Sequence, residues 1–235
     1  MSEIDLNCDL GEGPGEDAIY PCITSANIAC GGHAGDDATM EAAVRQSLSH
    51  GVAIGAHPSY PDREDFGRTA LAMTPDEIAW SVRAQVRALA RIASRAGAIV
   101  GHVKPHGALY GEAMRDAAVA EAVARGVASH DPGLVLVGLA GSPALELWRA
   151  LGFAVAGEGF ADRAYEPDGS LRSRRLPGAL ITDPAEAAAQ ALRLARDRRV
   201  DTICVHSDTP GAARILAEVR RVLAGEGCLL RPLRG

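Results

Sequence analysis

The sequence is poor in aromatic residues and has no excess of positive charge. Only 4% of its 235 residues are Phe, Trp or Tyr, so Ala, Val, Leu and Ile must fill most of the core. The formal net charge at pH 7 is -6. Without surplus Lys and Arg to neutralise phosphates, nucleic-acid binding is not expected as the main role.

Signals for membrane insertion, export and disulfide bonding are also missing. No apolar run approaches the length of a membrane span, and the N-terminal residues lack the basic and apolar segments of a signal peptide. The five cysteines are an odd number with no short paired spacing. Buried, reduced thiols are the favoured interpretation, with a nucleophilic Cys8 or Cys30 as a minor alternative. We therefore expect a cytoplasmic protein without membrane contacts.

The common nucleotide-binding and serine-hydrolase motifs are absent. There is no Gly-x-x-x-x-Gly-Lys-Ser/Thr loop, which excludes a classical P-loop. The stretch from Gly11 to Gly15 has the wrong spacing for a dinucleotide fingerprint, and Glu12 within it would repel a pyrophosphate. None of the serines lies in a nucleophile elbow.

What the sequence does contain is a regular alternation of strand and helix signals. The strands are short and apolar on both faces, as expected for parallel strands covered by helices. Helices are predicted at 37–50, about 113–129 and 183 to about 199, and after the Ser/Thr/Asp-Pro pairs at 74, 142, 183 and 209. About seven β-α units fit into the chain. We predict one domain over 1–235, an irregular, seven-stranded TIM-like (β/α) barrel, with an open doubly wound sheet as the alternative.

One polar stretch is too long for a simple turn. Residues 157–178 are rich in Gly, Pro, Arg and Asp, and predict a functional loop over the mouth of the barrel. The basic run 172–175 inside it is either a solvated surface or a grip for an anionic ligand.

Polar motifs follow strand after strand, where a barrel carries its active site. Alternation along the first strand points Asp5, Asn7 and Asp9 to one side, and we expect Asp5 to be structural and Asp9 functional. Lys104 either holds a carboxylate or phosphate or pairs with an acidic neighbour, Glu158 or Asp162. The motifs are Asp5 to Gly13, Asn27 to His33, Gly55 to Asp62, Lys104 to His106, Glu158 to Arg163 and His206 to Asp208.

Four histidines, at 33, 57, 106 and 206, come from different strand exits and are predicted to converge. Histidine is the usual general base near neutral pH and a common metal ligand. A divalent metal held by Asp9, His33 and His57 is one prediction. Glu158, Asp162 and Arg163 begin the polar stretch, where they either bind a substrate or fasten the loop.

These motifs closely resemble those of the LamB/YcsF family, in the family's order and over nearly the whole chain. They are Asp5-Leu-Asn-Cys-Asp-Leu-Gly-Glu, Ser25-Ala-Asn-Ile-Ala-Cys-Gly-Gly-His, Gly55-Ala-His-Pro-Ser-Tyr-Pro-Asp, Val103-Lys-Pro-His-Gly-Ala-Leu-Tyr, Glu158-Gly-Phe-Ala-Asp-Arg-Ala-Tyr and Val205-His-Ser-Asp. The resemblance implies a glycoside hydrolase/deacetylase-like barrel. It also implies one subunit of an ATP-dependent 5-oxoprolinase that works with two others, subunits B and C, and uses ATP with Mg²⁺ to open 5-oxo-L-proline to L-glutamate.

With that resemblance, two groups of site residues are predicted. The catalytic group is Asp9, His57, His106 and Glu158. The group that binds substrate or phosphate is Asn7, Glu12, Asn27, His33, Lys104, Asp162, Arg163, His206 and Asp208.

Two alternatives remain open at this point. One is a stand-alone, metal-dependent carbohydrate or amide deacetylase. The other is a carrier that delivers substrate to subunits B and C, although a scaffold would require apolar contact surface rather than ionisable clusters.

Overall fold

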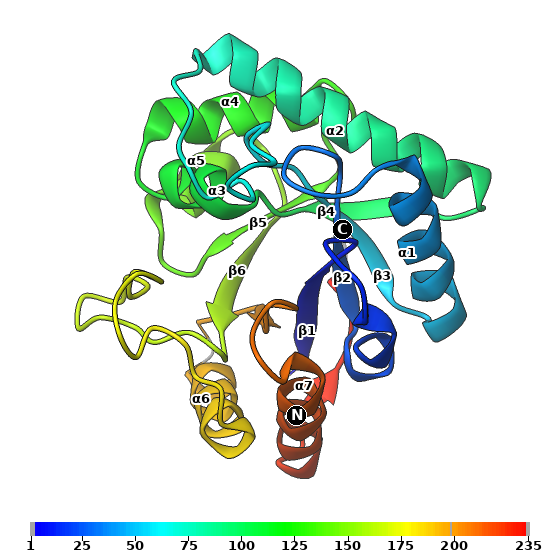
Figure 1. The fold of residues 1–235 in the computed structure, drawn as a ribbon. Coiled ribbons are helices and arrows are strands. Elements are labelled where there is room, and N and C mark those ends of the chain that lie inside the picture. Colours follow the sequence, from blue (N-terminus) through cyan, green and yellow to red (C-terminus); the bar gives the residue numbers. More distant parts are fainter. Residues whose placement is uncertain (1–2, 198, 234–235) are drawn as a thin grey trace.

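Seven parallel strands close into a barrel in the computed structural model, which describes residues 3–197 and 199–233 (Figure 1). β1 pairs with both β2 and β7, which closes the ring, and β8 (Leu229–Leu230) adds to the start of β1. The predicted irregular, seven-stranded TIM-like barrel is confirmed, and an open sheet is ruled out. The barrel strands are β1 (Glu3–Leu10), β2 (Ser25–Ala29), β3 (Ala53–His57), β4 (Val100–Val103), β5 (Val135–Leu139), β6 (Val155–Phe160) and β7 (Thr202–Cys204).

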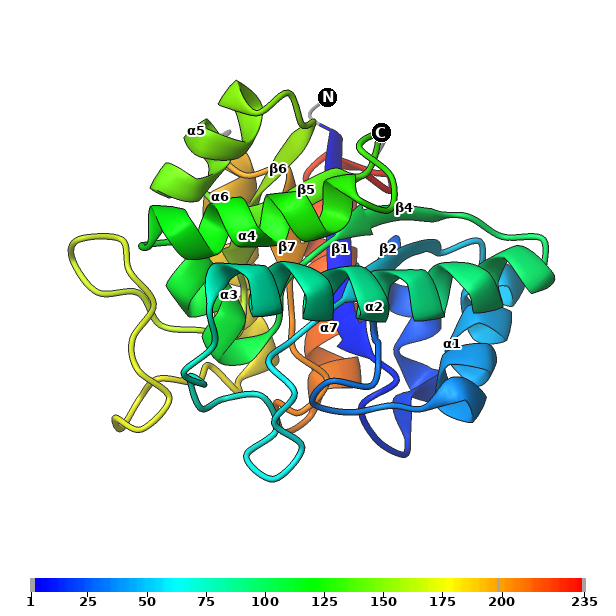
Figure 2. The same cartoon turned by 90° about the horizontal axis from the view of Figure 1, so that it is seen from above.

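Helices cover the outside of the barrel (Figure 2). Thr74 caps α2 in a capping box with Glu77, and Asp183 accepts a hydrogen bond from the Glu186 backbone amide at the start of α6. The helices are α1 (Asp37–His50), α2 (Pro75–Arg95), α3 (Gly107–Ala113), α4 (Ala117–Ala128), α5 (Pro143–Ala150), α6 (Pro184–Arg196) and α7 (Ala212–Gly225), with 3-10 turns η1 (Glu16–Ala18) and η2 (Tyr20–Cys22).

Three predicted helix boundaries were wrong. The helix expected at about 113–129 begins later, at Ala117, because Asp116 accepts hydrogen bonds from the backbone amides of Ala118 and Val119 and starts α4; the separate helix α3 has already ended at Ala113. The predicted end of α6 near Arg199 lies beyond its actual end at Arg196. α7 begins after Gly211, at φ 81°, and not at Thr209.

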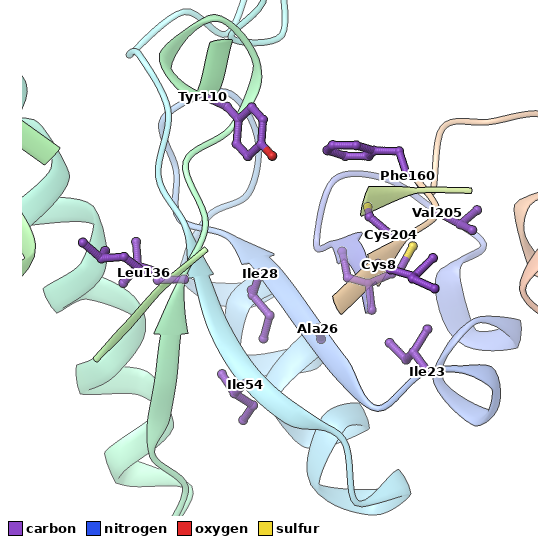
Figure 3. Packing of buried hydrophobic residues seen from close by; sticks show 14 of the residues in the cluster. Cys8, Ile23, Ala26, Ile28, Ile54, Tyr110, Leu136, Phe160, Cys204 and Val205 are labelled. Atoms are coloured by element: carbon purple, nitrogen blue, oxygen red, sulfur yellow. The ribbon is translucent and has the colours of Figure 1, made fainter. Parts of the chain in front are cut away.

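The core lies between the barrel and the helices. On α2, apolar residues that share one face of the helix, among them Val82, Val86 and Leu89, are fully buried. Ile28 on β2, Ile54 on β3 and Leu136 on β5 belong to the same buried cluster (Figure 3). Among the described residues, no helix is both long and apolar enough to cross a membrane.

The floor of the barrel is polar and is built around Asp5. Its carboxylate accepts hydrogen bonds from the hydroxyls of Thr24 (2.6 Å), Ser25 (2.6 Å) and Thr202 (2.5 Å). This supports the structural role expected for Asp5. Burial raises the pKa of Asp5 to about 6, although these hydrogen bonds oppose the shift.

Asp5→Asn should change how stability depends on pH. Because its pKa is raised, folded Asp5 holds its proton more tightly than in the unfolded chain, so the associated stability is present below about pH 4 and lost as the pH rises towards 6. Asn stays neutral, so the free energy of unfolding of the variant relative to wild type should rise by up to ~3 kcal/mol between acidic and neutral pH. Urea titrations at an acidic and at a neutral pH test this, with the exposed Glu121→Gln as control. The prediction would be wrong if the free energy of unfolding of Asp5→Asn differed from that of wild type by the same amount at both pH values.

A glycine of β3 allows a histidine to cross the barrel interior. A Cβ atom on Gly55 would lie 2.0 Å from His102 Nε2, so only glycine fits. His102 Nε2 lies 2.9 Å from Asn27 Oδ1. The role of His102, which the sequence does not reveal, is to support the polar residues that lie above it.

Candidate active site

A cavity of about 340 Å³ lies at the carboxyl ends of the barrel strands. One wall holds carboxylates and imidazoles from the barrel rim, and the other holds arginines from two loops. Of the predicted site residues, the lining includes Asp9, Glu12, His57, Lys104, His106, Arg163, His206 and Asp208. The other predicted residues contact this group from behind; they are Asn7, Asn27, His33, Glu158 and Asp162.

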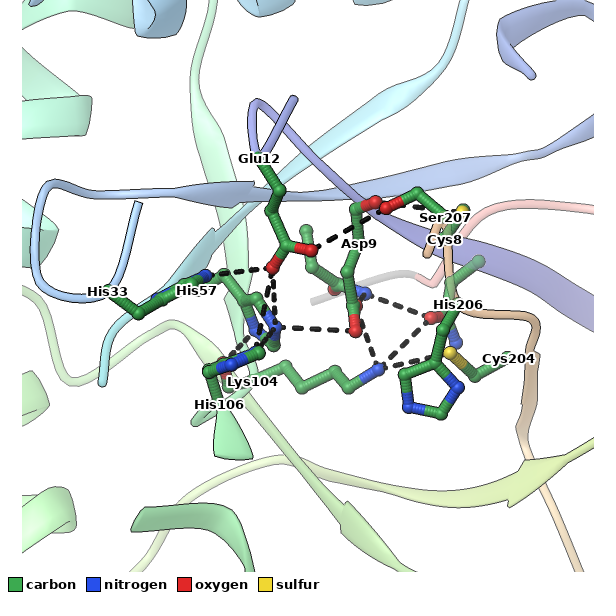
Figure 4. A network of polar contacts seen from close by, with 12 residues as sticks. Cys8, Asp9, Glu12, His33, His57, Lys104, His106, Cys204, His206 and Ser207 are labelled. Atoms are coloured by element: carbon green, nitrogen blue, oxygen red, sulfur yellow. Dashed lines mark hydrogen bonds and ion pairs between the residues drawn. The ribbon is translucent and has the colours of Figure 1, made fainter. Parts of the chain in front are cut away.

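The centre of the site is a buried lysine between two carboxylates. Figure 4 shows this lysine, Lys104, beside Asp9. Lys104 Nζ lies 2.9 Å from Asp9 Oδ1 and 2.8 Å from Glu158 Oε1, and all three residues are at most 2% exposed. Burial opposes the lysine charge, but the carboxylates outweigh it and hold the pKa of Lys104 well above its usual value. Lys104 thus pairs with Glu158, one of the two partners considered for it, and also with Asp9.

Two asparagines fix this ion-pair network from below. Asn27 donates from Nδ2 to Asp9 Oδ1 and to Asn7 Oδ1, both at 2.8 Å. Asn7 donates from Nδ2 to Glu158 Oε1 at 3.2 Å. Burial would raise the pKa of Asp9, but His57 and Lys104 hold it well below its usual range, so Asp9 is a carboxylate.

A histidine–aspartate pair forms the next part of the rim. His206 Nδ1 lies 3.0 Å from Asp162 Oδ2, which also accepts hydrogen bonds from the His206 backbone amide and the Thr209 hydroxyl. The His206 ring stacks on Phe160 with a centroid separation of 5.2 Å. Among the described residues His206 Nε2 has no hydrogen-bond partner, and its ring lines the cavity. Asp162 therefore orients His206 and also fastens the loop that follows β6.

Arginines form the opposite wall, and most belong to the segment between β6 and α6, drawn in yellow in Figure 1. Arg174 Nη1 lies 2.8 Å from Asp208, to which Arg68 also pairs. Arg163 is 7% exposed and bonds the Arg172 carbonyl, but among the described residues its Nε has no partner. The polar stretch predicted at 157–178 thus contributes to the cavity, although 157–160 belong to β6.

A third cluster places three imidazole rings around one carboxylate. Glu12 Oε1 lies 2.8 Å from His33 Nε2, 3.6 Å from His106 Nδ1 and 3.8 Å from His57 Nε2. Burial lowers the pKa of His33 to about 3 and raises that of Glu12 well above its usual value. In the predicted metal set of Asp9, His33 and His57, Asp9 Oδ2 approaches only His57, at 3.3 Å, and Glu12 is the carboxylate that lies among the rings.

Several lining residues were not predicted from the sequence. Arg68 stands alone in a loop, and no motif marks it. Tyr110 and Phe160 lie inside motifs but resemble core residues. Arg174 and Arg175 belong to the basic run, for which a solvated surface was an equal alternative.

Fold and site together define a (β/α)-barrel protein with a polar, partly enclosed cavity at the carboxyl rim of its strands. The chain belongs to the LamB/YcsF family, whose family model matches residues 4–235.

Two relatives with high sequence identity carry the same name, and a third has a solved structure. The chain is 51% identical over 249 residues to the A subunit of 5-oxoprolinase from Chloroflexus aggregans, covering 98% of this chain and 99% of that protein. It is 43% identical to the protein of the same name from Pyrococcus furiosus, covering 98% of each. The crystal structure of the lactam utilization protein from Thermus thermophilus superposes with a TM-score of 0.92 at 41% identity, covering 98% of this chain and all of that one.

A solved structure with much lower sequence identity shares only the fold with this chain. The family 4 carbohydrate esterase from Streptomyces lividans superposes with a TM-score of 0.55 at 14% identity, covering 97% of this chain and 91% of that one. It supports the deacetylase-like barrel predicted from the sequence.

Proposed function

We propose that this chain is the A subunit of an ATP-dependent 5-oxoprolinase. With subunits B and C, it would hydrolyse 5-oxo-L-proline to L-glutamate while ATP is hydrolysed to ADP and phosphate. The names of its relatives support this proposal. The observation that carries it is the cavity itself, in which arginines face a wall of buried carboxylates and imidazoles.

The size of the cavity suits a small substrate. Its volume of about 340 Å³ is near the lower end of the range of small-molecule sites, about 300–1,000 Å³. A five-membered lactam with one phosphoryl group fits this volume better than the same lactam beside a whole nucleotide. We therefore assign ATP and its Mg²⁺ to a site on, or shared with, subunits B and C.

The proposed chemistry needs activation, since an unstrained lactam resists hydrolysis. Transfer of the γ-phosphoryl group of ATP to the lactam oxygen would make the ring carbon electrophilic. Water then adds to that carbon, the ring C–N bond breaks, and the nitrogen takes up a proton. This leaves an acyl phosphate, which a second water hydrolyses to the carboxylate of the open amino acid and phosphate. The overall reaction therefore consumes two waters and one ATP and also releases ADP.

The geometry favours His206 for the proton transfers. Its Nδ1 is held by Asp162, while Nε2 is the ring nitrogen left to exchange a proton. Both ring nitrogens of His57 and of His106, which belong to the predicted catalytic group, are already within hydrogen-bond distance of protein atoms. Asp9 lies beside them as a carboxylate that can orient the attacking water.

The arginines on one wall of the cavity are the groups best suited to bind the substrate carboxylate or phosphoryl group. Lys104, also predicted to hold an anion, is enclosed by Asp9 and Glu158, so we assign this role to Arg163 and Arg174. Arg163 presents a buried Nε without a partner among the described residues.

Arg163→Met should therefore weaken substrate binding more than it slows the reaction. We expect KM for 5-oxoproline to rise about 10- to 100-fold, the loss of a charge-assisted hydrogen bond of about 1.5–3 kcal/mol. Arg172→Met is the matched control, because Arg172 belongs to the same segment but does not line the cavity. Steady-state kinetics of the three-subunit mixture give both KM and kcat. Equal effects of the two substitutions would show that Arg163 acts only by holding the loop.

The proposal as a whole is tested by reconstitution. Glutamate release from 5-oxo-L-proline, ATP and Mg²⁺ is measured with this chain alone, with subunits B and C alone, and with all three. We expect glutamate only from the complete mixture. If the complete mixture were inactive and the chain alone removed acetyl groups without ATP, the deacetylase alternative would take its place.

A further inference from the structure

The rings of His57 and His106 face each other in a way that neutral imidazoles alone do not explain. His57 Nδ1 lies 2.7 Å from the Lys104 carbonyl, and His106 Nε2 lies 2.9 Å from the Phe66 carbonyl. A carbonyl oxygen only accepts, so both of these nitrogens carry hydrogen. The other nitrogens, His57 Nε2 and His106 Nδ1, then present lone pairs to each other at 2.9 Å. Something positive must lie between or beside them.

Two further ligand atoms point to the same place. Glu12 and His33 each contribute one further ligand atom, and the four ligand atoms of this cluster all lie within 4.8 Å of one another (Figure 4). The four residues come from three different strand exits and the start of α3. Ligands of a tetrahedral metal at about 2.0–2.1 Å lie about 3.3 Å apart. The separations of 2.8, 2.9, 3.6 and 3.8 Å within this set lie on both sides of that value.

The surroundings hold the rings in this orientation. Within residues 3–197 and 199–233, Phe66 is the non-glycine residue with a positive φ, 56°, and this backbone directs its carbonyl to His106. A Cβ on Gly67 would lie 2.8 Å from His33 Cβ, so the loop packs directly on the rings. Backbone carbonyls that bind the outer nitrogens of two rings are the usual second layer around metal-binding histidines.

A neighbouring group of possible metal ligands differs from this cluster, because a lysine already occupies it. Asp9, Cys204 and His206 also lie within reach of one another. There, however, Lys104 Nζ is inserted, at 2.9 Å from Asp9 Oδ1 and 3.2 Å from Cys204 Sγ. That group already has its cation, whereas in the cluster of Glu12, His33, His57 and His106 no Lys or Arg nitrogen of the described residues lies within ion-pair distance of Glu12.

We propose that Glu12, His33, His57 and His106 form a binding site for a divalent transition metal of the zinc type. A single proton would satisfy only the pair of facing nitrogens, whereas a metal accounts for all four converging atoms. Three nitrogens and one carboxylate oxygen select Zn²⁺ or Co²⁺ over Mg²⁺. The site is at the wall of the cavity, and it stands on its own contacts whether or not the chain acts on a lactam.

The test is metal binding by the isolated chain, without subunits B and C. Protein stripped with a chelator is titrated with Zn²⁺, Co²⁺ and Mg²⁺; bound metal is measured by elemental analysis and the Co²⁺ ligand field by visible absorption. We expect one equivalent of Zn²⁺ or Co²⁺, a tetrahedral Co²⁺ spectrum, and a rise in Tm of about 5–10 °C at saturating metal. Mg²⁺ should produce none of these.

Two conservative variants and a control locate the site. Glu12→Gln and His106→Gln should each weaken Zn²⁺ binding by more than about ten-fold, whereas the exposed His130→Gln should bind as wild type does. Circular dichroism checks that each variant is folded, and either folded variant suffices. The proposed site would be wrong if wild type bound no stoichiometric Zn²⁺ or Co²⁺, or if both folded variants bound Zn²⁺ as tightly as wild type. A proton shared between the two rings would then explain their contact.

Discussion

Replacing Lys104 with Met is expected to destabilise the protein by about 3–5 kcal/mol, because it leaves two buried carboxylates without their cation. Asp9 and Glu158 both contact Lys104 Nζ closely, at 2.9 and 2.8 Å, and neither carboxylate is open to solvent. For a chain of this length, each kcal/mol corresponds to a shift in Tm of about 2–4 °C. The Tm of Lys104→Met should therefore lie about 6–20 °C below that of wild type.

A double-mutant cycle separates the ion pair from the loss of packing. If unpaired charge causes the damage, adding Glu158→Gln to Lys104→Met should recover part of the stability, although Glu158→Gln alone destabilises. The exposed pair of Arg125 and Asp76 is the matched control, and Arg125→Met should cost less than about 1 kcal/mol. Additive effects of Lys104→Met and Glu158→Gln would contradict the account of this network.

His206→Gln is expected to lower kcat of the three-subunit mixture by about 10²- to 10⁴-fold, the usual contribution of a positioned acid or base. KM should change little, because the arginines are assigned to substrate binding. Asp162→Asn should also lower kcat, since the amide can present its NH₂ group to His206 Nδ1 and thereby favour the other ring tautomer.

A surface histidine and a test of folding serve as controls for His206→Gln. His130→Gln, on the surface, should leave kcat unchanged. Unfolding curves establish that His206→Gln remains folded, because the ring also stacks on Phe160. Full activity of folded His206→Gln would transfer the proton-transfer role back to His57 or His106, as the sequence first indicated.

The barrel could be predicted because its signals are local. Helix starts such as Thr74-Pro75 and short apolar strands repeat along the chain, and a polar motif follows six of the seven barrel strands, all except β5. Alternation along β1 correctly placed Asp5, Asn7 and Asp9 on one buried side. These features depend on residues a few positions apart.

The remaining details of the site depend on how loops turn. Gly11, at φ 73°, ends the alternation of β1 and returns Glu12 to the rings of His33 and His106, which is why Glu12 rather than Asp9 lies among them. Arg68 reaches the cavity because its loop pairs it with Asp208, 140 residues further along the chain. No pattern in the sequence encodes such long-range contacts.

The central claim is that the rim of this barrel opens an activated lactam. The most direct measurement follows ATP consumption and glutamate release in the same reaction of all three subunits, with wild-type chain and with His206→Gln. We expect the wild-type chain to release glutamate in step with ATP consumption and the variant to release almost none. Glutamate released at the same rate with His206→Gln, or by subunits B and C without this chain, would contradict it.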